Sequence, residues 1–177
     1  MKKILGAELL VEYARGRRNF SAVDLSEADL FEAKLSGIDL TGSKLRKTYL
    51  SYSNLSQAEL QQAELLSAEL TNAQLYQSNL SQANLQNANL FRAVLRRAIL
   101  RHANLAGANL QSADLSNADL SGADLSNADL RGANLRKANL ANTKLYGCNL
   151  FRAQKAELSY AYLDSLTIYP DGYRVVD

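Results

Sequence analysis

Leucine recurs at every fifth position of the chain from Leu25 to Leu150, twenty-six times without interruption, and Phe20 extends the series by one step. Two residues before each leucine stands a small or β-branched residue, which is alanine in eighteen of the twenty-six cases. The residue between them is Asp or Asn in sixteen cases, and the two residues after each leucine are mostly polar. Each five-residue unit therefore has two apolar positions separated by a polar one.

A five-residue period fits neither a regular helix nor a flat strand. In an α-helix with about 3.6 residues per turn, leucines five apart would spiral around every side. In a strand, side chains alternate between faces, so an odd spacing would place every second leucine in water. The chain keeps all its leucines on one side only if it turns a corner every five residues, which winds it into coils stacked about 4.8 Å apart. The pattern therefore predicts an all-β solenoid with leucine along its axis.

The corners are predicted at the two residues that follow each leucine. Six of the nine glycines stand at the second of these positions, where a turn tolerates a positive φ. They are Gly37, Gly42, Gly107, Gly122, Gly132 and Gly147. The spacing by itself allows coils with three or four sides.

The units ADLSN, SGADL, RGANL and QSADL follow the signature A(D/N)LXX, and the chain resembles the pentapeptide-repeat family over residues 18–168. This resemblance implies a right-handed quadrilateral β-helix with four units per coil, so that about thirty units form seven to eight coils. The segment YARGRRNF at 13–20 is similar to the N-terminal segment of cyanobacterial, heterocyst-regulating members of the family.

Both ends of the chain depart from the repeat. We expect one domain, 1–177, with a helical cap in 1–17, a β-helix in 18–168 and a capping tail in 169–177. Apolar residues in 3–15 stand on a helix-forming background that Gly16 ends, which predicts a short helix over the first coil. The tail TIYPDGYRVV contains a Pro-Asp-Gly turn and resembles the terminal turns of cyanobacterial members of the family.

The repeat loses its phase near residues 151–156. After Leu150 the leucines resume at Leu158 and Leu163, and Ile168 fits the same phase, so we read three extra residues and a bulged corner near Gln154–Lys155. Residues 156–166 also fit the spacing of a terminal helix. Continued coil is the favoured interpretation.

Composition excludes several classes of protein. The net charge of +2, with 21% charged residues, does not indicate a polyanion or a polycation. No apolar stretch approaches the roughly 18 residues that span a membrane. Glu8 interrupts the apolar start of the chain, so we expect no signal peptide and a cytoplasmic protein.

The sequence predicts no enzyme, and no cofactor or metal. The one histidine, His102, has no partner at ligand spacing, and the one cysteine, Cys148, stands in the small inward position. Four aspartates occupy successive units at 114–129, which on a four-sided coil places each on a different face, too far apart to share a proton or a metal.

A candidate contact surface lies in FRAVLRRAILRH at 91–102, where two positions that are usually polar are apolar and arginines surround them. Exposed apolar residues rimmed by arginine are typical of protein contact surfaces. The predicted partner-binding residues are Phe91, Arg92, Val94, Arg96, Arg97, Ile99 and Arg101. On a four-sided plan Phe31, Phe91 and Phe151 share one face with Tyr49, Tyr52, Arg92, Arg131 and Arg152. The alternative is that these arginines only keep the rod soluble.

The favoured function is that of a non-enzymatic protein–protein interaction module. The resemblance to the family implies a regulatory protein of cyanobacterial type. We expect a monomer or an end-to-end homodimer. One alternative is a DNA mimic that binds DNA gyrase, as quinolone-resistance members of the family do, although the charge of +2 disfavours it. Another is a structural solenoid without a specific ligand. Nucleic-acid binding is disfavoured because the aspartates at 114–129 would interrupt a track of phosphates.

Overall fold

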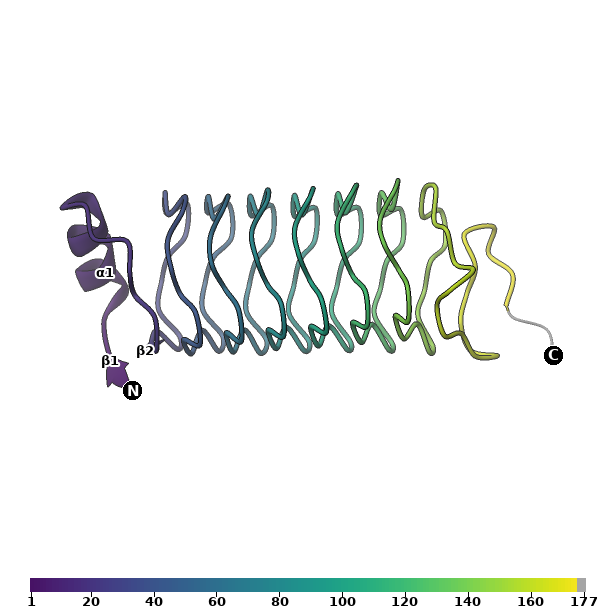
Figure 1. The fold of residues 1–177 in the computed structure, drawn as a ribbon, viewed down its shortest axis with the longest axis horizontal. Coiled ribbons are helices and arrows are strands. Elements are labelled where there is room, and N and C mark those ends of the chain that lie inside the picture. The colour runs from purple at the N-terminus through teal and green to yellow at the C-terminus, as the bar shows by residue number, and fades with distance from the viewer. Residues whose placement is uncertain (175–177) are drawn as a thin grey trace.

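The protein is a rod of stacked coils, seen in a computed structural model that describes residues 1–174 (Figure 1). Its regular elements all lie near the N-terminus: β1 (Lys2–Lys3), α1 (Gly6–Ala14) and β2 (Val23–Asp24). Helix α1 lies across one end of the rod, and the last described residues lie at the other end (Figure 1).

Successive coils pair in parallel, and the paired residues are 20 positions apart. The bridges run from Asn19↔Asp39 to Asn134↔Gln154 and join the residue before each leucine to its equivalent one coil on. Four units of five residues therefore make one coil, which confirms the four-sided plan. Over residues 1–174 only β1 and β2 form a two-stranded sheet, because a corner in every unit leaves few extended residues on each side. The expected total of seven to eight coils stays a prediction.

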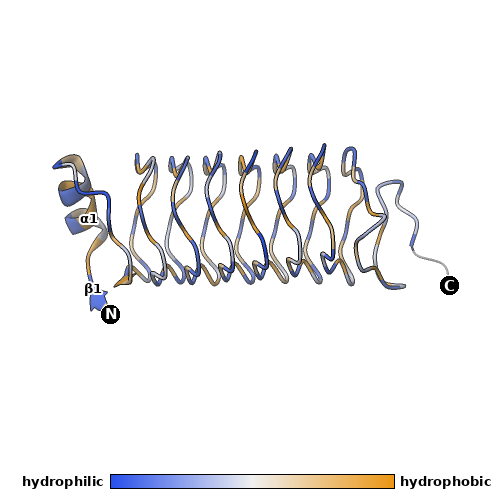
Figure 2. Ribbon diagram, viewed as in Figure 1, coloured by the Kyte–Doolittle hydropathy of each residue, from blue (hydrophilic) through white to orange (hydrophobic). Residues whose placement is uncertain are grey.

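The core of the rod is the column of leucines. Each leucine of the series from Leu25 to Leu150 is buried, and so is Phe20 at its head. Polar and apolar stretches alternate around every coil (Figure 2). Where a hydroxyl replaces alanine in the inward position, it usually donates to a backbone carbonyl, as Thr143 does to Leu120 O at 2.8 Å. Ser53 is an exception, because its buried hydroxyl has no hydrogen-bond partner.

The corners have one backbone conformation. The second corner residue has a φ between 52° and 69° in every unit from Ala22 to Arg152, whether or not it is glycine. The bond from Ala98 N to Leu95 O, 3.0 Å, is typical of those that close each corner, and Leu95 N donates to Asp114 O of the next coil at 2.8 Å. The continuous ladder compensates a conformation that costs roughly 1–2 kcal/mol per non-glycine residue.

The N-terminal cap begins later than its composition predicts. The helix was expected over 3–15, but α1 starts at Gly6 because Lys2 and Lys3 extend the sheet instead, pairing in parallel with Val23 and Asp24. Gly6 is tightly placed, since a Cβ there would lie 2.6 Å from Asp29 O. The predicted stop is confirmed: Gly16 adopts a φ of 99° directly beyond the helix.

The phase break near 151–156 is real, but its predicted sense is wrong. Beyond Gln154 the bridges are Lys144↔Tyr162 and Asn149↔Ile168, so the paired residues are 18 and 19 positions apart instead of 20. The last coil is therefore shorter than the others, not longer. In a five-residue repeat, the insertion of three residues shifts the leucines to the same phase as the deletion of two, so the leucine spacing does not distinguish them.

Residues 156–166 form turns and a single bridge rather than a helix, which agrees with the favoured interpretation. Leu158 and Leu163 pack against the core, although both are only partly buried. Ile168 does not continue the leucine phase as expected: it bridges from the outward position, and the fully buried Thr167 fills the inward one.

The Pro-Asp-Gly segment forms the predicted turn. Tyr169 N donates to Tyr173 O at 2.7 Å, and Ile168 pairs antiparallel with Arg174. Gly172 has a φ of 93°, and a Cβ on it would lie 3.3 Å from the Phe151 ring. The last part of the expected capping tail, 175–177, lies outside the described residues.

Candidate functional site

The polar position before each leucine has a structural task. Asp114 Oδ1 accepts a hydrogen bond from Ser116 N at 3.0 Å, and Asn104 Oδ1 accepts one from Ala106 N at 3.1 Å. The same contact recurs along the rod, because a short carboxylate or amide reaches the amide two residues on and holds the corner. Val94 and Ile99 have no such acceptor. The coil at 91–102 therefore lacks two corner contacts and has a partly buried Val94 and an exposed Ile99 in their place.

The structure spreads the seven predicted residues over more than one face. Phe91 and Arg92 form one corner, Arg96 and Arg97 the next, and Arg101 the third. Because a coil has four sides, the first and third corners are diagonally opposite. A flat partner can reach either the Val94 face, between the first two corners, or the Ile99 face, between the second and third, but not both.

The arginines of this coil differ in how their charges are neutralised. Arg101 Nε donates to Asp119 Oδ2 at 2.5 Å. Burial tends to raise the pKa of Asp119, but hydrogen bonds from Arg101 and Ser121 and the charge of Arg101 outweigh it and lower the pKa. In the part of the chain that the structure describes, Arg96 and Arg97 take part in no ion pair. Their charges remain available to a partner.

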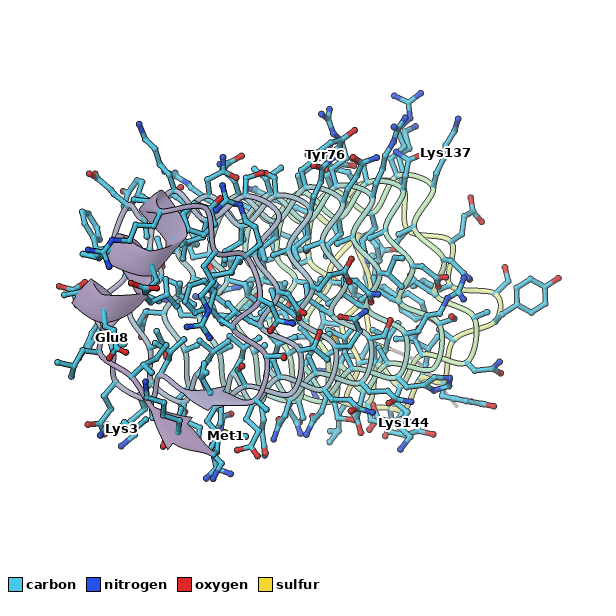
Figure 3. All side chains as sticks on the ribbon, turned by 60° about the vertical axis from the view of Figure 1, so that its left-hand side comes forward. Met1, Lys3, Glu8, Tyr76, Lys137 and Lys144 are labelled. Carbon is cyan, nitrogen blue, oxygen red and sulfur yellow. The ribbon has the colours of Figure 1, made fainter. Side chains whose placement is uncertain are left out.

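Tyr76 belongs to this site, although the sequence analysis missed it. The Arg96 guanidinium lies 5.0 Å from the centre of the Tyr76 ring, and Arg97 Nη1 donates to Tyr76 Oη at 3.4 Å. Tyr76 is 20 residues before Arg96, so the coil period could have identified it. It projects from the same edge of the rod as Lys137 (Figure 3).

The structure places the reactive residues of the sequence in separate surroundings. Burial, with a smaller contribution from Asp129, raises the pKa of Cys148 to about 12, so its thiol is protonated at neutral pH. His102 is exposed at a corner. The aspartates at 114–129 stand on successive sides of the rod, and within residues 1–174 no group of three potential ligands could hold a metal ion. Nor does this part of the chain contain a helix long and apolar enough to cross a membrane.

We expect the free energy of unfolding of Ile99→Asn to exceed that of Ile99→Ala by about 0.5–1.5 kcal/mol, the usual net value of one hydrogen bond. The asparagine Oδ1 would accept a hydrogen bond from Arg101 N, as Asn139 Oδ1, two coils further along the same column, accepts one from Ala141 N at 3.1 Å. Urea unfolding followed by circular dichroism measures the change. Ile99→Ala removes the apolar side chain without adding an acceptor and is the control. An asparagine variant no more stable than the alanine variant would contradict the prediction.

The sequence matches the family described as Pentapeptide repeats, with eight copies. The matched segments are residues 18–46, 24–62, 43–82, 78–117, 88–127 and 113–152. No curated protein sequence is significantly similar to the chain.

The solved structures that are similar to this chain include the following three. HetL, a pentapeptide repeat protein involved in heterocyst differentiation regulation from the cyanobacterium Nostoc sp. strain PCC 7120, is 33% identical; the match covers 97% of this chain and 100% of HetL, with a TM-score of 0.42. QnrB1, a plasmid-mediated fluoroquinolone resistance protein, is 19% identical over 92% of this chain and 87% of its own, with a TM-score of 0.48. Another pentapeptide repeat protein from Nostoc PCC 7120 is 26% identical over 92% and 98%, with a TM-score of 0.37.

Proposed function

Because this chain belongs to the pentapeptide repeat family, we propose that it is a non-enzymatic module that binds another protein through the coil at 91–102. The observation that carries the proposal is the loss of two corner acceptors at Val94 and Ile99 beside uncompensated arginines. Eight other units also lack Asp or Asn at this position, but they have Lys, Glu, Gln or Tyr there, and only Val94 and Ile99 are aliphatic. Family membership implies a right-handed β-helix, a rigid support for such a surface.

The Ile99 face is the better of the two faces. Ile99 is 37% exposed and stands between Arg97 and Arg101. It pairs with Asn79 on one side and Asp119 on the other, so it is an isolated apolar point among polar residues. Apolar anchors and arginines are typical of binding hot spots. A partner would place an apolar residue on Ile99 and carboxylates near Arg96 and Arg97.

We also propose a regulatory role of the cyanobacterial type in the cytoplasm. The sequence similarity to HetL, which is involved in heterocyst differentiation regulation, supports the regulatory part of this proposal. Gyrase binding by DNA mimicry receives no support from the surface. The aspartates at 114–129 surround one coil instead of following the rod, and the net charge is +2.

We expect a bait in which Arg92, Arg96, Arg97 and Arg101 are all changed to alanine to lose a partner that the wild-type rod captures from a lysate of the source cell. The captured protein, once purified, should bind the variant at least about tenfold more weakly, the effect of losing roughly 1.4 kcal/mol at the hot-spot residues. Isothermal titration calorimetry measures the change.

Two further baits locate the site. Arg97→Ala with Ile99→Asn disrupts the Ile99 face alone and should reproduce the loss. The control, Arg136→Ala with Lys137→Ala, removes two charges from the same corner column two coils away and should bind as the wild type does. If all baits capture the same proteins, the arginines only solvate the rod.

A further inference from the structure

Three phenylalanines stand on one edge of the rod at equal spacing. Phe31, Phe91 and Phe151 are the first corner residues of units 60 positions apart, which is three coils at 20 residues per coil. We call the corner column that contains them the phenylalanine edge. All three rings are partly or largely exposed to solvent.

The two later phenylalanines each have a guanidinium of their own. Arg92 follows Phe91 and lies 4.9 Å from the centre of its ring, and Arg152 follows Phe151 at 5.0 Å. The sequences there are Phe-Arg-Ala at 91–93 and 151–153, whereas 31–33 reads Phe-Glu-Ala. Phe31 is 54% exposed, and the centre of its ring lies 5.7 Å from the centre of the Tyr52 ring in an edge-to-face arrangement. The residue after Phe31 is therefore the anionic Glu32, whereas the residues after Phe91 and Phe151 are the cationic Arg92 and Arg152.

The surroundings of Phe31 would attract a cation. A hollow of about 360 Å³ is lined by Phe31 and Tyr49 together with the carboxylates of Glu27 and Asp29. An aromatic face attracts a cation through its quadrupole, and nearby carboxylates add charge attraction. A guanidinium is the group that the rod itself places on its aromatic rings.

A basic hollow occupies the other end of the same edge. It has a volume of about 370 Å³, and its lining includes Phe151, Arg152 and Arg131. Asp129 already pairs with Arg131, its Oδ2 lying 2.7 Å from Nη2. Arg152 takes part in no ion pair within residues 1–174. The Arg152 guanidinium can therefore bind an anion from another molecule.

We propose that two copies of this chain associate side by side and antiparallel along the phenylalanine edge, with Arg152 of each copy placed on Phe31 and Glu32 of the other. A two-fold axis perpendicular to the rods near Phe91 produces this register, because Phe31 and Phe151 both lie three coils from Phe91. The contact is isologous, so the Arg152–Glu32 pair forms twice and the assembly closes as a dimer. The acidic hollow of one copy then faces the basic hollow of the other.

The second copy fits this edge better than an unrelated partner does. Glu32 and Arg152 stand at equal distances from the centre of one edge and are complementary in this register, whereas the two Arg92 side chains meet near the axis and oppose association. The strip spans six coil intervals, about 29 Å at the sheet spacing of ~4.8 Å, but it is one corner wide. We therefore infer a weak dimer, with a dissociation constant in the micromolar range that small interfaces show.

Sedimentation-velocity ultracentrifugation of the full chain tests the dimer over about 1–200 μM, a range that brackets micromolar association. The wild type should change from monomer to dimer as concentration rises. Glu32→Arg and Arg152→Glu should each raise the dissociation constant at least tenfold, because each places like charges together twice. The double variant should dimerise as the wild type does.

Mixing the two single variants is the sharpest arm of the experiment. A heterodimer of Glu32→Arg with Arg152→Glu contains two opposite-charge contacts, so the mixture should form dimers although neither variant does alone. A complex that grows beyond a dimer would show head-to-tail contact and overturn the two-fold arrangement.

The backbone accepts both substitutions. Glu32 and Arg152 have φ of 54° and 60°, and each receives a residue that the equivalent corner already holds. Lys137→Glu, at an exposed second corner residue with φ 57° on the neighbouring corner column, is the matched control and should leave the dissociation constant unchanged. A wild type that stays monomeric throughout, or a dimer that neither reversal weakens, overturns the proposal.

Discussion

Leu95→Ala is expected to lower the free energy of unfolding by about 2.7–5 kcal/mol, the range for a leucine removed from a well-packed core. Leu95 is fully buried in the leucine column. Its unit bridges those of Gln74 and Asp114, so the cavity would open between two coils that contain leucine at the same position. The main-chain ladder keeps these coils at a set spacing and resists collapse into the space. We therefore expect a value in the upper part of the range.

Chemical denaturation followed by far-ultraviolet circular dichroism measures this loss. Arg96→Ala is the control: it is the next residue, it is exposed, and it should change the free energy of unfolding by no more than about 0.5 kcal/mol. A loss below about 1 kcal/mol for Leu95→Ala would show that the coils close over the missing side chain. The column would then not be the main source of stability.

Phe20→Ala should cost about 3–5 kcal/mol, the typical range for a buried phenylalanine. Phe20 heads the leucine column and is fully buried, and the Arg17 guanidinium lies 4.5 Å from the centre of its ring. Leu9 of α1 is fully buried in the same apolar cluster. Removal of the ring would leave a space at the end where the cap meets the first coil, so α1 should loosen as well.

Two measurements separate these effects. Denaturation reports the global loss, and amide hydrogen exchange reports whether α1 loses protection before the coils do. Arg17→Ala removes only the guanidinium and should cost no more than about 1 kcal/mol. If the amides of α1 keep their protection in Phe20→Ala, the cap is held by the β1–β2 pairing and not by the ring.

Predictions from the sequence succeeded wherever one local rule repeats. Each five-residue unit by itself predicts four features. Its leucine points inward, a small residue stands two positions before the leucine, a polar residue stands between them, and a corner follows. The twenty-six repetitions leave no other way to bury the leucines. The four-sided plan came from the resemblance to the family, and the 20-residue pairing confirms it.

Predictions failed where the repeat ends. A period of five cannot tell a gain of three residues from a loss of two, so the short last coil was read as a long one and Ile168 was placed in the wrong phase. At the other end, composition favours a helix from residue 3, but the open edge of the first coil binds Lys2 and Lys3 as a strand. Both outcomes depend on which backbone groups are free in a neighbouring coil.

The sequence by itself determined the leucine column, the corners and the departure at Val94 and Ile99, because these are properties of single units. Only the tertiary structure decided which charges are neutralised by a neighbouring coil and which are not. Arg101 is held by Asp119 of the next coil, whereas Arg96 and Arg97 reach Tyr76 of the previous one. The physical reason is that stacking brings residues about 20 positions apart into contact. Ion pairs and cation–π contacts between neighbouring coils then determine which charges are neutralised.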